Sequence, residues 1–413
     1  MTELIRMTSS HYNTNLKFVF SPNDQSLLRL AVVAMLLHCV LITPVFAQRT
    51  IRQGVIRVDD QPGRNDSEKI ENAMRTEVPN YTGIKTLQLS SRRYFFHRPL
   101  KIGKDFSIVS EGAGARSTEV IFYDVHNYPI VDGFRALLQL ENRGDGRKFS
   151  GLNINAYALY NGQQVQVDNV IAIRASSLSS SEFDGIKINL QNLFGNNHIG
   201  ISVEKKAILN NTESVVFRNI AVYAPIPFYI VSGDNLHFED LDLTCTNGPV
   251  SGTFKSACVQ YGPSSKPDHH IFDGSQTWQG GRHALYLNSN AKFRGSGLIL
   301  RNVRYEQSMG TGDIPNESPV PAWVIKFEND SSNPVASEVS RATEVVTMDG
   351  CRHSENHQIA YELRNIMRVQ INHNCRLNGR KSFINDAYNS AGQLIFEHDN
   401  TDQIAPLPNH PPF

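Results

Sequence analysis

The stretch Phe183-Asp184-Gly185-Ile186-Lys187-Ile188-Asn189 decides the fold, because its pattern recurs from the first third of the chain almost to its end. An aromatic or aliphatic residue and a polar residue precede a Gly, Asn or Asp, and an alternating strand follows. These three residue types enter the left-handed backbone region at least cost, so the third position predicts a sharp corner between two strands. The other predicted corner residues are Gly151, Asn219, Asp240, Gly274, Asn302, Gly350 and Asn374.

A further strand of alternating apolar residues precedes each corner by a variable turn. These first strands begin at Leu138, Ile171, Ile201, Phe228, Val259, Leu285, Trp323 and Ile359, and successive corners lie 21 to 48 residues apart. Such a repeat is typical of a solenoid, in which each coil contacts mainly its neighbours and insertions leave the stack as loops. The scarcity of two-residue hairpin signals argues against a β-propeller. We therefore predict an all-β, single-stranded right-handed parallel β-helix.

The chain divides into three predicted regions. Residues 1–47 contain an apolar run from Leu30 to Phe46 and read as a signal peptide or an uncleaved N-terminal anchor, with the mature chain starting near Gln48. Residues 48–404 form the β-helix domain, and the proline-rich residues 405–413 form a disordered tail. We expect a secreted, cell-surface or periplasmic protein with no membrane contact beyond the N-terminal segment.

The start of the β-helix domain carries the one convincing helix signal of the mature chain. Asn65 provides a capping residue, acids follow in the first turn, and apolar residues share one face up to Arg75. Extended segments follow, including Pro99-Leu100-Lys101-Ile102 and Glu111-Gly112-Ala113-Gly114, and then the strand Thr118-Glu119-Val120-Ile121. This order resembles the opening of the pectate-lyase superfamily. The resemblance implies a short N-terminal capping helix on a right-handed parallel β-helix.

Net charge does not identify a partner. The 413 residues include 40 Lys and Arg and 40 Asp and Glu, so no global field attracts nucleic acid or an anionic membrane. We expect an extracellular polysaccharide as partner, no nucleic acid, and a monomer or small homo-oligomer. No acidic ladder typical of calcium occurs, so calcium use stays open and no metal site is assigned.

Four cysteines remain after residue 47, which suits two disulfides in an oxidising compartment. Cys351 and Cys375 each follow a corner residue, so stacking places them about 4.8 Å apart, as a disulfide or a buried thiol pair. Cys245 and Cys258 flank a loop whose base a second bridge would hold. The alternative, a metal site of Cys351, Cys375, His353 and His373, has suitable ligand types but is less expected in a secreted protein.

The resemblance implies a polysaccharide groove over the first strand of each coil. Side chains alternate between the faces of a strand, which predicts an outward-facing set on the middle coils. The set comprises Tyr229, Gln260, Tyr286, Asn288 and Lys326, beside the return loop Trp278-Gln279-Gly280-Gly281-Arg282-His283. The two glycines would let a backbone approach a ligand closely. An exposed ladder of this kind is also common on a merely solvated sheet face.

These residue types suit β-elimination of a uronate polymer, which needs a base, an acid and a cation that neutralises the carboxylate. We assign His283 or Lys326 as base, Tyr286 as acid and Arg282 as carboxylate clamp. Trp278 and Tyr229 would be sugar platforms, and Gln260 and Asn288 further binding residues. A glycoside hydrolase is the first alternative, with Glu306 and Asp268 as available carboxylates. A non-catalytic carbohydrate-binding or surface solenoid is the second.

Overall fold

The computed structural model describes most of the chain from residue 54 onward. Described are residues 4–5, 18–19, 54–111, 118–140, 145–204, 212–246, 248–265, 267–289, 297–306, 321–327, 345–353, 359–366, 368–371, 376–377, 381–387 and 395–398. The chain forms two units, one of Met1–Val55 with Glu77–Thr82 and one of Ile56–Thr76 with Gly83–Phe413.

The first unit holds the short strands β1 (Leu4–Ile5) and β2 (Phe18–Val19), which pair antiparallel. The predicted signal or anchor segment between Leu30 and Phe46 lies outside the described residues, as does the predicted tail at 405–413. Among the described residues, no helix is both long and apolar enough to cross a membrane.

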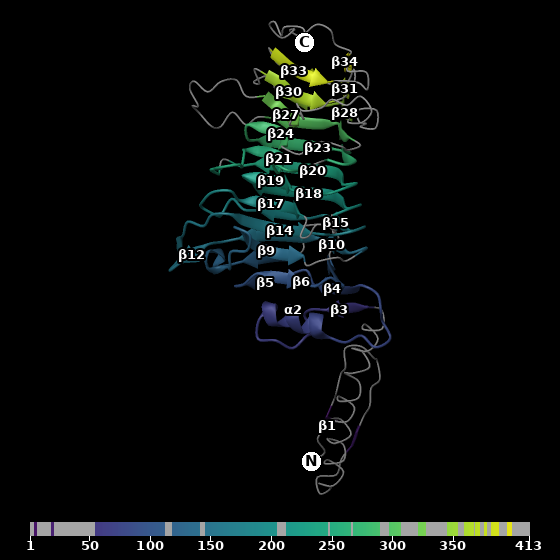
Figure 1. The fold of residues 1–413 in the computed structure, drawn as a ribbon. Coiled ribbons are helices and arrows are strands. Elements are labelled where there is room, and N and C mark those ends of the chain that lie inside the picture. Colours follow the sequence, from purple (N-terminus) through teal and green to yellow (C-terminus); the bar gives the residue numbers. More distant parts are fainter. Residues whose placement is uncertain are drawn as a thin grey trace. The chain divides into compact units, whose positions relative to one another are not determined.

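The second unit is a stack of parallel coils, seen in Figure 1 as strands that follow one another in sequence order from β6 to β33. One face of the stack, here called sheet 1, contains the predicted first strands. Its described strands are β6 (Leu100–Ile102), β9 (Arg135–Leu140), β14 (Val170–Ser176), β17 (Ile199–Glu204), β19 (Ile226–Ile230), β21 (Ala257–Tyr261), β24 (His283–Ser289), β27 (Pro321–Phe327), β30 (Ile359–Ile366) and β33 (Lys381–Ala387). All adjacent pairs are parallel.

Sheet 2 contains the strands before and after each corner. Its described strands are β3 (Val55–Arg57), β4 (Lys85–Leu89), β5 (Arg93–Phe96), β7 (Phe106–Ser110), β8 (Thr118–Phe122), β10 (Lys148–Ser150), β11 (Leu152–Ala156), β15 (Glu182–Asp184), β16 (Lys187–Asn189), β18 (Val216–Ala224), β20 (His237–Cys245), β22 (His270–Asp273), β23 (Gln276–Gly280), β25 (Leu298–Arg301), β26 (Val303–Glu306), β28 (Val345–Asp349), β29 (Arg352–His353), β31 (Arg368–Ile371), β32 (Arg376–Leu377) and β34 (Ile395–His398). The fold is the predicted single-stranded right-handed parallel β-helix.

The corners adopt the predicted left-handed backbone. Gly185 has a φ of 63° and Asn219 a φ of 54°, and the corner residues Gly151, Asp240, Gly274, Asn302 and Gly350 all have φ between 52° and 74°. Asn374, the last predicted corner, lies outside the described residues. The corner prediction is therefore confirmed at every described copy.

In five copies of the motif, the residue two positions before the corner is a phenylalanine that points inward and stacks on its neighbour in the column. The column comprises Phe149, Phe183, Phe217, Phe238 and Phe272, each with 0 % exposure. Successive ring centroids are 4.9, 4.8, 5.2 and 4.3 Å apart, with planes within 25° of parallel. Burial of these rings contributes to the apolar area that stabilises the stack.

The N-terminal end of the stack carries the predicted helix, α2 (Asp66–Arg75), which packs against β4 and β5. Asn65 caps it by accepting a hydrogen bond from the Glu68 backbone N–H at 2.9 Å. Ile70 and Ala73 of α2 are fully buried. The predicted capping helix is therefore confirmed.

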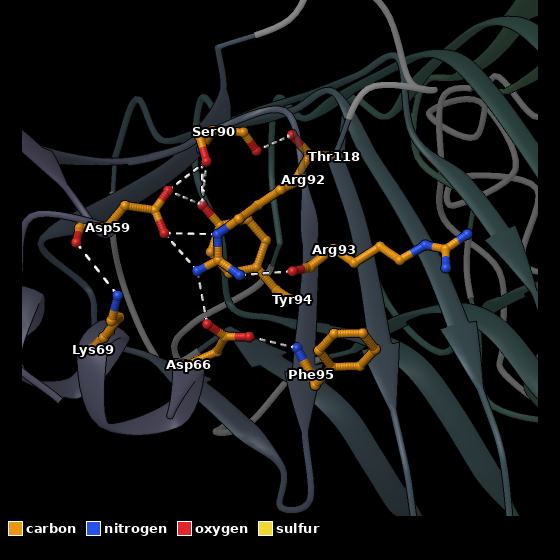
Figure 2. Close-up of polar contacts among 9 residues, drawn as sticks. All are labelled: Asp59, Asp66, Lys69, Ser90, Arg92, Arg93, Tyr94, Phe95 and Thr118. Atoms are coloured by element: carbon orange, nitrogen blue, oxygen red, sulfur yellow. Dashed lines mark hydrogen bonds and ion pairs between the residues drawn. The ribbon is translucent and has the colours of Figure 1, made fainter. Parts of the chain in front are cut away.

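A partly buried network of hydrogen bonds and ion pairs links α2 to the first coil (Figure 2). The Arg92 guanidinium donates to Asp59 and to Asp66, and Asp66 in turn accepts the backbone N–H of Phe95 at 2.7 Å. Tyr94 donates to the other Asp59 oxygen at 2.7 Å. Burial opposes ionisation of Asp59, but the hydrogen bonds from Arg92, Ser90 and Tyr94 outweigh it and lower its pKa from 3.8 to about 2.

Three smaller elements leave the coils. A single 3₁₀ turn, η1 (Val125–Asn127), precedes a tight hairpin at Val131–Phe134, and β12 (Leu159–Tyr160) pairs antiparallel with β13 (Gln163–Gln164). Asp132-Gly133 and Asn161-Gly162 form the two turns, with positive φ at all four residues. This is the geometry of two-residue hairpins.

Candidate functional site

One row of outward positions on sheet 1 runs through the predicted site. Register pairs join Arg174 to Ser202, Ser202 to Tyr229, Tyr229 to Gln260, and Gln260 to Tyr286. The predicted alignment of Tyr229, Gln260 and Tyr286 on adjacent coils is therefore confirmed. The members from Arg174 to Gln260 are at most 8 % exposed, Tyr286 is half-buried, and its register partner on β27, Val324, is 1 % exposed.

Tyr286 and four further predicted site residues lie on two adjacent coils. Arg282 and Asn288 are exposed, Tyr286 and Lys326 are half-buried, and His283 is buried. The rings of His283 and Tyr286 have centroids 5.1 Å apart at 48°. The Asn288 amide donates to the Tyr286 hydroxyl at 3.5 Å, and Asn288 is the register partner of Lys326 in β27.

Residues 248–256, here called the strap, cover the row at β19 and β21. The Gln260 side chain donates to the Thr253 carbonyl at 2.8 Å and accepts the Lys255 N–H at 2.9 Å. The ring of Phe254 packs on Tyr229 with centroids 5.2 Å apart. The expectation that Tyr229 is an exposed sugar platform and Gln260 a sugar-binding residue is therefore wrong, because the strap occupies both side chains.

Trp278 is also not a sugar platform. It lies in β23 of sheet 2 with 0 % exposure, and its ring packs against Phe272 and Trp323 with centroids 5.4 and 5.9 Å away. Its register partner is the buried Leu243 of β20. The indole N–H donates to the Gln276 side chain at 3.1 Å. What reads as a return loop in the sequence is a core strand, so the predicted role of Trp278 is corrected.

The glycine pair before Arg282 has a packing role. Gly280 and Gly281 have φ of 70° and 72°, which forms the turn between β23 and β24. A Cβ atom on Gly281 would lie 2.6 Å from the Cys245 Sγ and 3.2 Å from the Ser256 carbonyl. Close approach to the protein's own strap and thiol explains this glycine without a ligand.

At the buried end of the row, Arg174 forms several ion pairs and hydrogen bonds. The Arg174 guanidinium donates to Glu204 at 2.7 Å, to Asp132 at 3.0 Å and to the Val131 carbonyl at 3.2 Å. Glu204 also accepts from the Ser202 hydroxyl at 2.7 Å. These contacts hold the Val131–Phe134 hairpin over sheet 1, so Arg174 serves the fold at this position.

The cysteines are thiols in the described part of the chain. Cys245 and Cys258 are buried and unbridged, so the predicted disulfide between them is wrong. The Cys245 thiol donates to the Pro225 carbonyl at 2.9 Å, and that of Cys258 to the Gln279 carbonyl at 3.5 Å. Burial raises the pKa of Cys245 to about 12, which keeps it protonated.

The second predicted cysteine pair is seen only in part. Cys351 is a buried thiol whose Sγ donates to the Leu300 carbonyl at 3.4 Å. Cys375 lies outside the described residues, although the flanking Arg352 and Arg376 are register partners as stacking requires. Among the described residues, no three His, Cys, Asp or Glu side chains gather in a way that could hold a metal ion.

The two carboxylates considered for hydrolysis lie away from Tyr286. Glu306 ends β26 in sheet 2, where it forms an ion pair with Arg304. Asp268 precedes β22, and its carboxylate lies 3.5 Å from Nδ1 of His269. Neither belongs to sheet 1, which holds the cluster around Tyr286.

Sequence reasoning missed the residues that shape the site from outside the coils. Asn197 holds the strap through hydrogen bonds to the backbone of Pro249 and Ser251, and Phe134 packs edge-on to Phe254 at 5.8 Å. The dipeptide Asp132-Gly133 is a recognisable signal for the hairpin that presents Phe134. No local signal marks Asn197 as a strap partner.

No family model matches the chain, and no curated protein matches it. Among solved structures, ORF18 of Geobacillus virus E2 is similar at 10 % identity with a TM-score of 0.31, covering 90 % of this chain. The present chain spans 66 % of the length of that viral protein. The A-module of the mannuronan C-5 epimerase AlgE4 from Azotobacter vinelandii is similar at 12 % identity with a TM-score of 0.24, over 80 % of this chain and 100 % of that one. Likenesses this distant carry no argument about activity.

Proposed function

We propose that this protein is a secreted enzyme that cleaves a uronate-containing polysaccharide by β-elimination. The observation that carries the proposal is the cluster around Tyr286 on β24, on β27 and in the turn that precedes β24. There an exposed arginine, a histidine and tyrosine in ring contact, an exposed asparagine and a lysine meet on two adjacent coils. A cation, a base and an acid are the groups that this reaction requires.

The chemistry assigns each side chain one task. Arg282 pairs with the substrate carboxylate, which makes the hydrogen on C5 more acidic. His283 or Lys326 removes that proton, the C4–O bond breaks as the C4=C5 double bond forms, and the Tyr286 hydroxyl protonates the departing oxygen. Asn288, within hydrogen-bond distance of the Tyr286 hydroxyl, orients it. Atoms and electrons balance without an oxidant or a reductant.

Base and acid act from one side of the substrate in this arrangement. Tyr286 and the candidate base Lys326 both take outward positions on sheet 1, because Asn288, two residues after Tyr286, is the register partner of Lys326. A polymer lying on sheet 1 would therefore meet both from the same side. The C5 hydrogen and the C4 oxygen must then leave from the same face of the sugar. D-mannuronate and D-glucuronate linked through O4 satisfy this, whereas D-galacturonate places the two groups on opposite faces. The proposed substrate is therefore a mannuronate- or glucuronate-containing polymer.

Incubation with 4-linked polymannuronate, polyglucuronate and polygalacturonate tests the proposal. We expect the ultraviolet absorbance of a C4=C5 unsaturated product from the first two and not from the third. Tyr286→Phe and Arg282→Ala should each lower the rate by about 10²-fold or more, because each removes a group that acts in the transition state. Tyr160→Phe, on the exposed hairpin β12–β13, is the matched control and should leave the rate unchanged.

Separate outcomes contradict separate parts of the proposal. Full activity in both Tyr286→Phe and Arg282→Ala would show that the reaction occurs elsewhere. New reducing ends without ultraviolet absorbance would identify a hydrolase, and binding without any cleavage would identify a carbohydrate-binding solenoid. The two candidate bases are separated by His283→Gln and Lys326→Met, of which only the true base should lose activity.

A further inference from the structure

We infer that the buried Tyr305 hydroxyl and the Ser256 carbonyl position Arg282 for the reaction by fixing both ends of the peptide group that joins Gly281 to Arg282. The inference rests on the proposed function, because it takes Arg282 as the group that pairs with the substrate carboxylate. Tyr305 and Ser256 act through the backbone of the turn between β23 and β24, so they are positioning residues.

The peptide group between Gly281 and Arg282 is held at both of its polar atoms. The Tyr305 hydroxyl donates to the Gly281 carbonyl at 3.1 Å. The Arg282 N–H, which belongs to the same peptide group, donates to the Ser256 carbonyl at 2.9 Å, and the following N–H, that of His283, donates to the same carbonyl at 3.1 Å. Rotation of this peptide group would break both of its hydrogen bonds and leave their partners unpaired.

The turn depends on these hydrogen bonds because its own backbone has unusual conformational freedom. Gly280 and Gly281 both have positive φ, and glycine populates positive and negative φ about equally readily. β23 ends at Gly280 and β24 begins at His283, so Gly281 and Arg282 lie between the ends of the two strands. The direction in which Arg282 leaves the backbone is therefore set by the contacts of this peptide group.

Packing in the core gives the Tyr305 hydroxyl a fixed place. Tyr305 lies in β26 with 0 % exposure and is the register partner of Trp278. Its ring packs edge-on to Trp323 with centroids 6.4 Å apart. Burial raises the pKa of the Tyr305 hydroxyl well above its ordinary value, so the group stays protonated and remains a hydrogen-bond donor. The core of this coil thus defines where the Gly281 carbonyl must lie.

The Ser256 carbonyl is placed by the strap and by β21. Ser256 is the last residue of the strap and directly precedes Ala257, the first residue of β21. Its hydroxyl lies 3.4 Å from the Cys245 Sγ, and the Gln260 side chain holds the neighbouring strap residue Lys255 by its backbone N–H. Arg282 is therefore positioned by parts of the chain that precede and follow it, from Ser256 to Tyr305.

Tyr305→Phe removes one of the two hydrogen bonds and keeps the packed ring. We expect kcat/KM on the cleaved polymer to fall about 10-fold, because a displaced Arg282 pairs less well with the carboxylate in the transition state. Tyr128→Phe is the matched control, since Tyr128 is 4 % exposed and donates to the Phe96 carbonyl at 3.1 Å near the other end of the stack. It should leave kcat/KM unchanged, and circular dichroism checks that both variants fold.

A double-mutant cycle separates positioning from a general effect on the fold. If Tyr305 acts through Arg282, then Tyr305→Phe added to Arg282→Ala should lower kcat/KM by no more than a further factor of about 2. A merely structural role would produce the same loss in both backgrounds. Equal losses in the two backgrounds, or full activity in Tyr305→Phe, would overturn the inference even if the lyase activity is confirmed.

The two proposals fail in distinguishable ways. If no polymer yields unsaturated product, the lyase proposal fails, whereas hydrogen exchange tests the lock on the turn without any substrate. The amides of Arg282 and His283 should exchange faster in Tyr305→Phe than in the native protein, as measured by mass spectrometry of peptides that contain the turn. Tyr128→Phe should leave them unchanged. Equal exchange in Tyr305→Phe and the native protein would overturn the inference.

Discussion

His198 is a buried histidine immediately before β17, and neither ring nitrogen has a hydrogen-bond partner among the described residues. Burial lowers its pKa from 6.5 to about 4, and the nearby Asp168 carboxylate opposes this only in part. The unfolded chain therefore takes up a proton near pH 6.5 that the folded chain accepts only near pH 4. Stability present at pH 7 is lost as the pH falls through this window.

Replacement of His198 by Phe tests this pH dependence. A shift of this size corresponds to about 3 kcal/mol between pH 7 and pH 4. We expect urea unfolding of His198→Phe to show a shallower loss of stability over that range than the native protein. The loss is not abolished, because His270 is fully buried and its pKa is likewise lowered to about 4. The control His97→Phe changes an exposed ring, and an identical slope in both variants would contradict the prediction.

The contrast between Trp278 and Tyr286 shows what residue patterns can predict. Side chains alternate between the two faces of a strand, which predicts that Tyr286 points outward. Its register pairing with Gln260 confirms this position. Trp278 was expected in a return loop, but it lies on a strand that one extra residue after the corner Gly274 separates from that corner, so that Gln276 occupies the level that Leu241 occupies one coil earlier. A single insertion exchanges the two faces of a strand.

At the scale of single elements, the left-handed corner is the feature on which each coil depends. Gly185 has a φ of 63°, a conformation that costs an ordinary L-residue about 1–2 kcal/mol. Asn already occupies the equivalent corners at positions 219 and 302. The corner therefore selects for residues that tolerate this conformation, not for glycine alone.

Matched variants of Gly185 measure that selection. Gly185→Val should lower the free energy of unfolding by about 2 kcal/mol or more, because β-branching adds to the cost of a positive φ. Gly185→Asn should cost clearly less, since Asn visits this region readily. Chemical denaturation of both variants gives the comparison, and equal losses would mean that packing, not backbone conformation, restricts the corner.

Elements outside the coils were the least predictable. The turns Asp132-Gly133 and Asn161-Gly162 carry a known hairpin signal, yet against a background of parallel strands they read as ordinary loops. The strap has no periodic pattern at all. Its position depends on contacts with Asn197 and Phe134, which lie more than 50 residues earlier in the chain. Such distant contacts leave no trace in local sequence.

For the whole molecule, we expect a substitution in one coil to be coupled energetically only to substitutions in neighbouring coils. The phenylalanine column makes this testable, because its rings touch in sequence order, with Phe183 and Phe217 separated by 4.8 Å. In a stack of this kind each coil contributes an intrinsic term and an interface term with its neighbour. The overall fold was predictable for the same reason, since each coil repeats the same corner and strand pattern.

Double-mutant cycles measure the range of this coupling. Phe183→Leu and Phe217→Leu lie in contact, so their combined effect should deviate from the sum of the single effects by about 0.5 kcal/mol or more. Phe149→Leu and Phe272→Leu lie four coils apart in the column and should be additive within about 0.5 kcal/mol. Urea denaturation provides the free energies. Strong coupling of the distant pair would indicate a stack that folds as one indivisible unit.

The tryptophan pair in the core gives the molecule an optical reporter of its own. Trp278 and Trp323 are the two tryptophans of the chain, both have 0 % exposure, and their ring centroids lie 5.9 Å apart. Their fluorescence reports only on the coils between β23 and β27, while Tyr94 lies at the other end beside α2. Emission that shifts to longer wavelength before the far-ultraviolet dichroism changes would show these coils separating while the capped end is still folded.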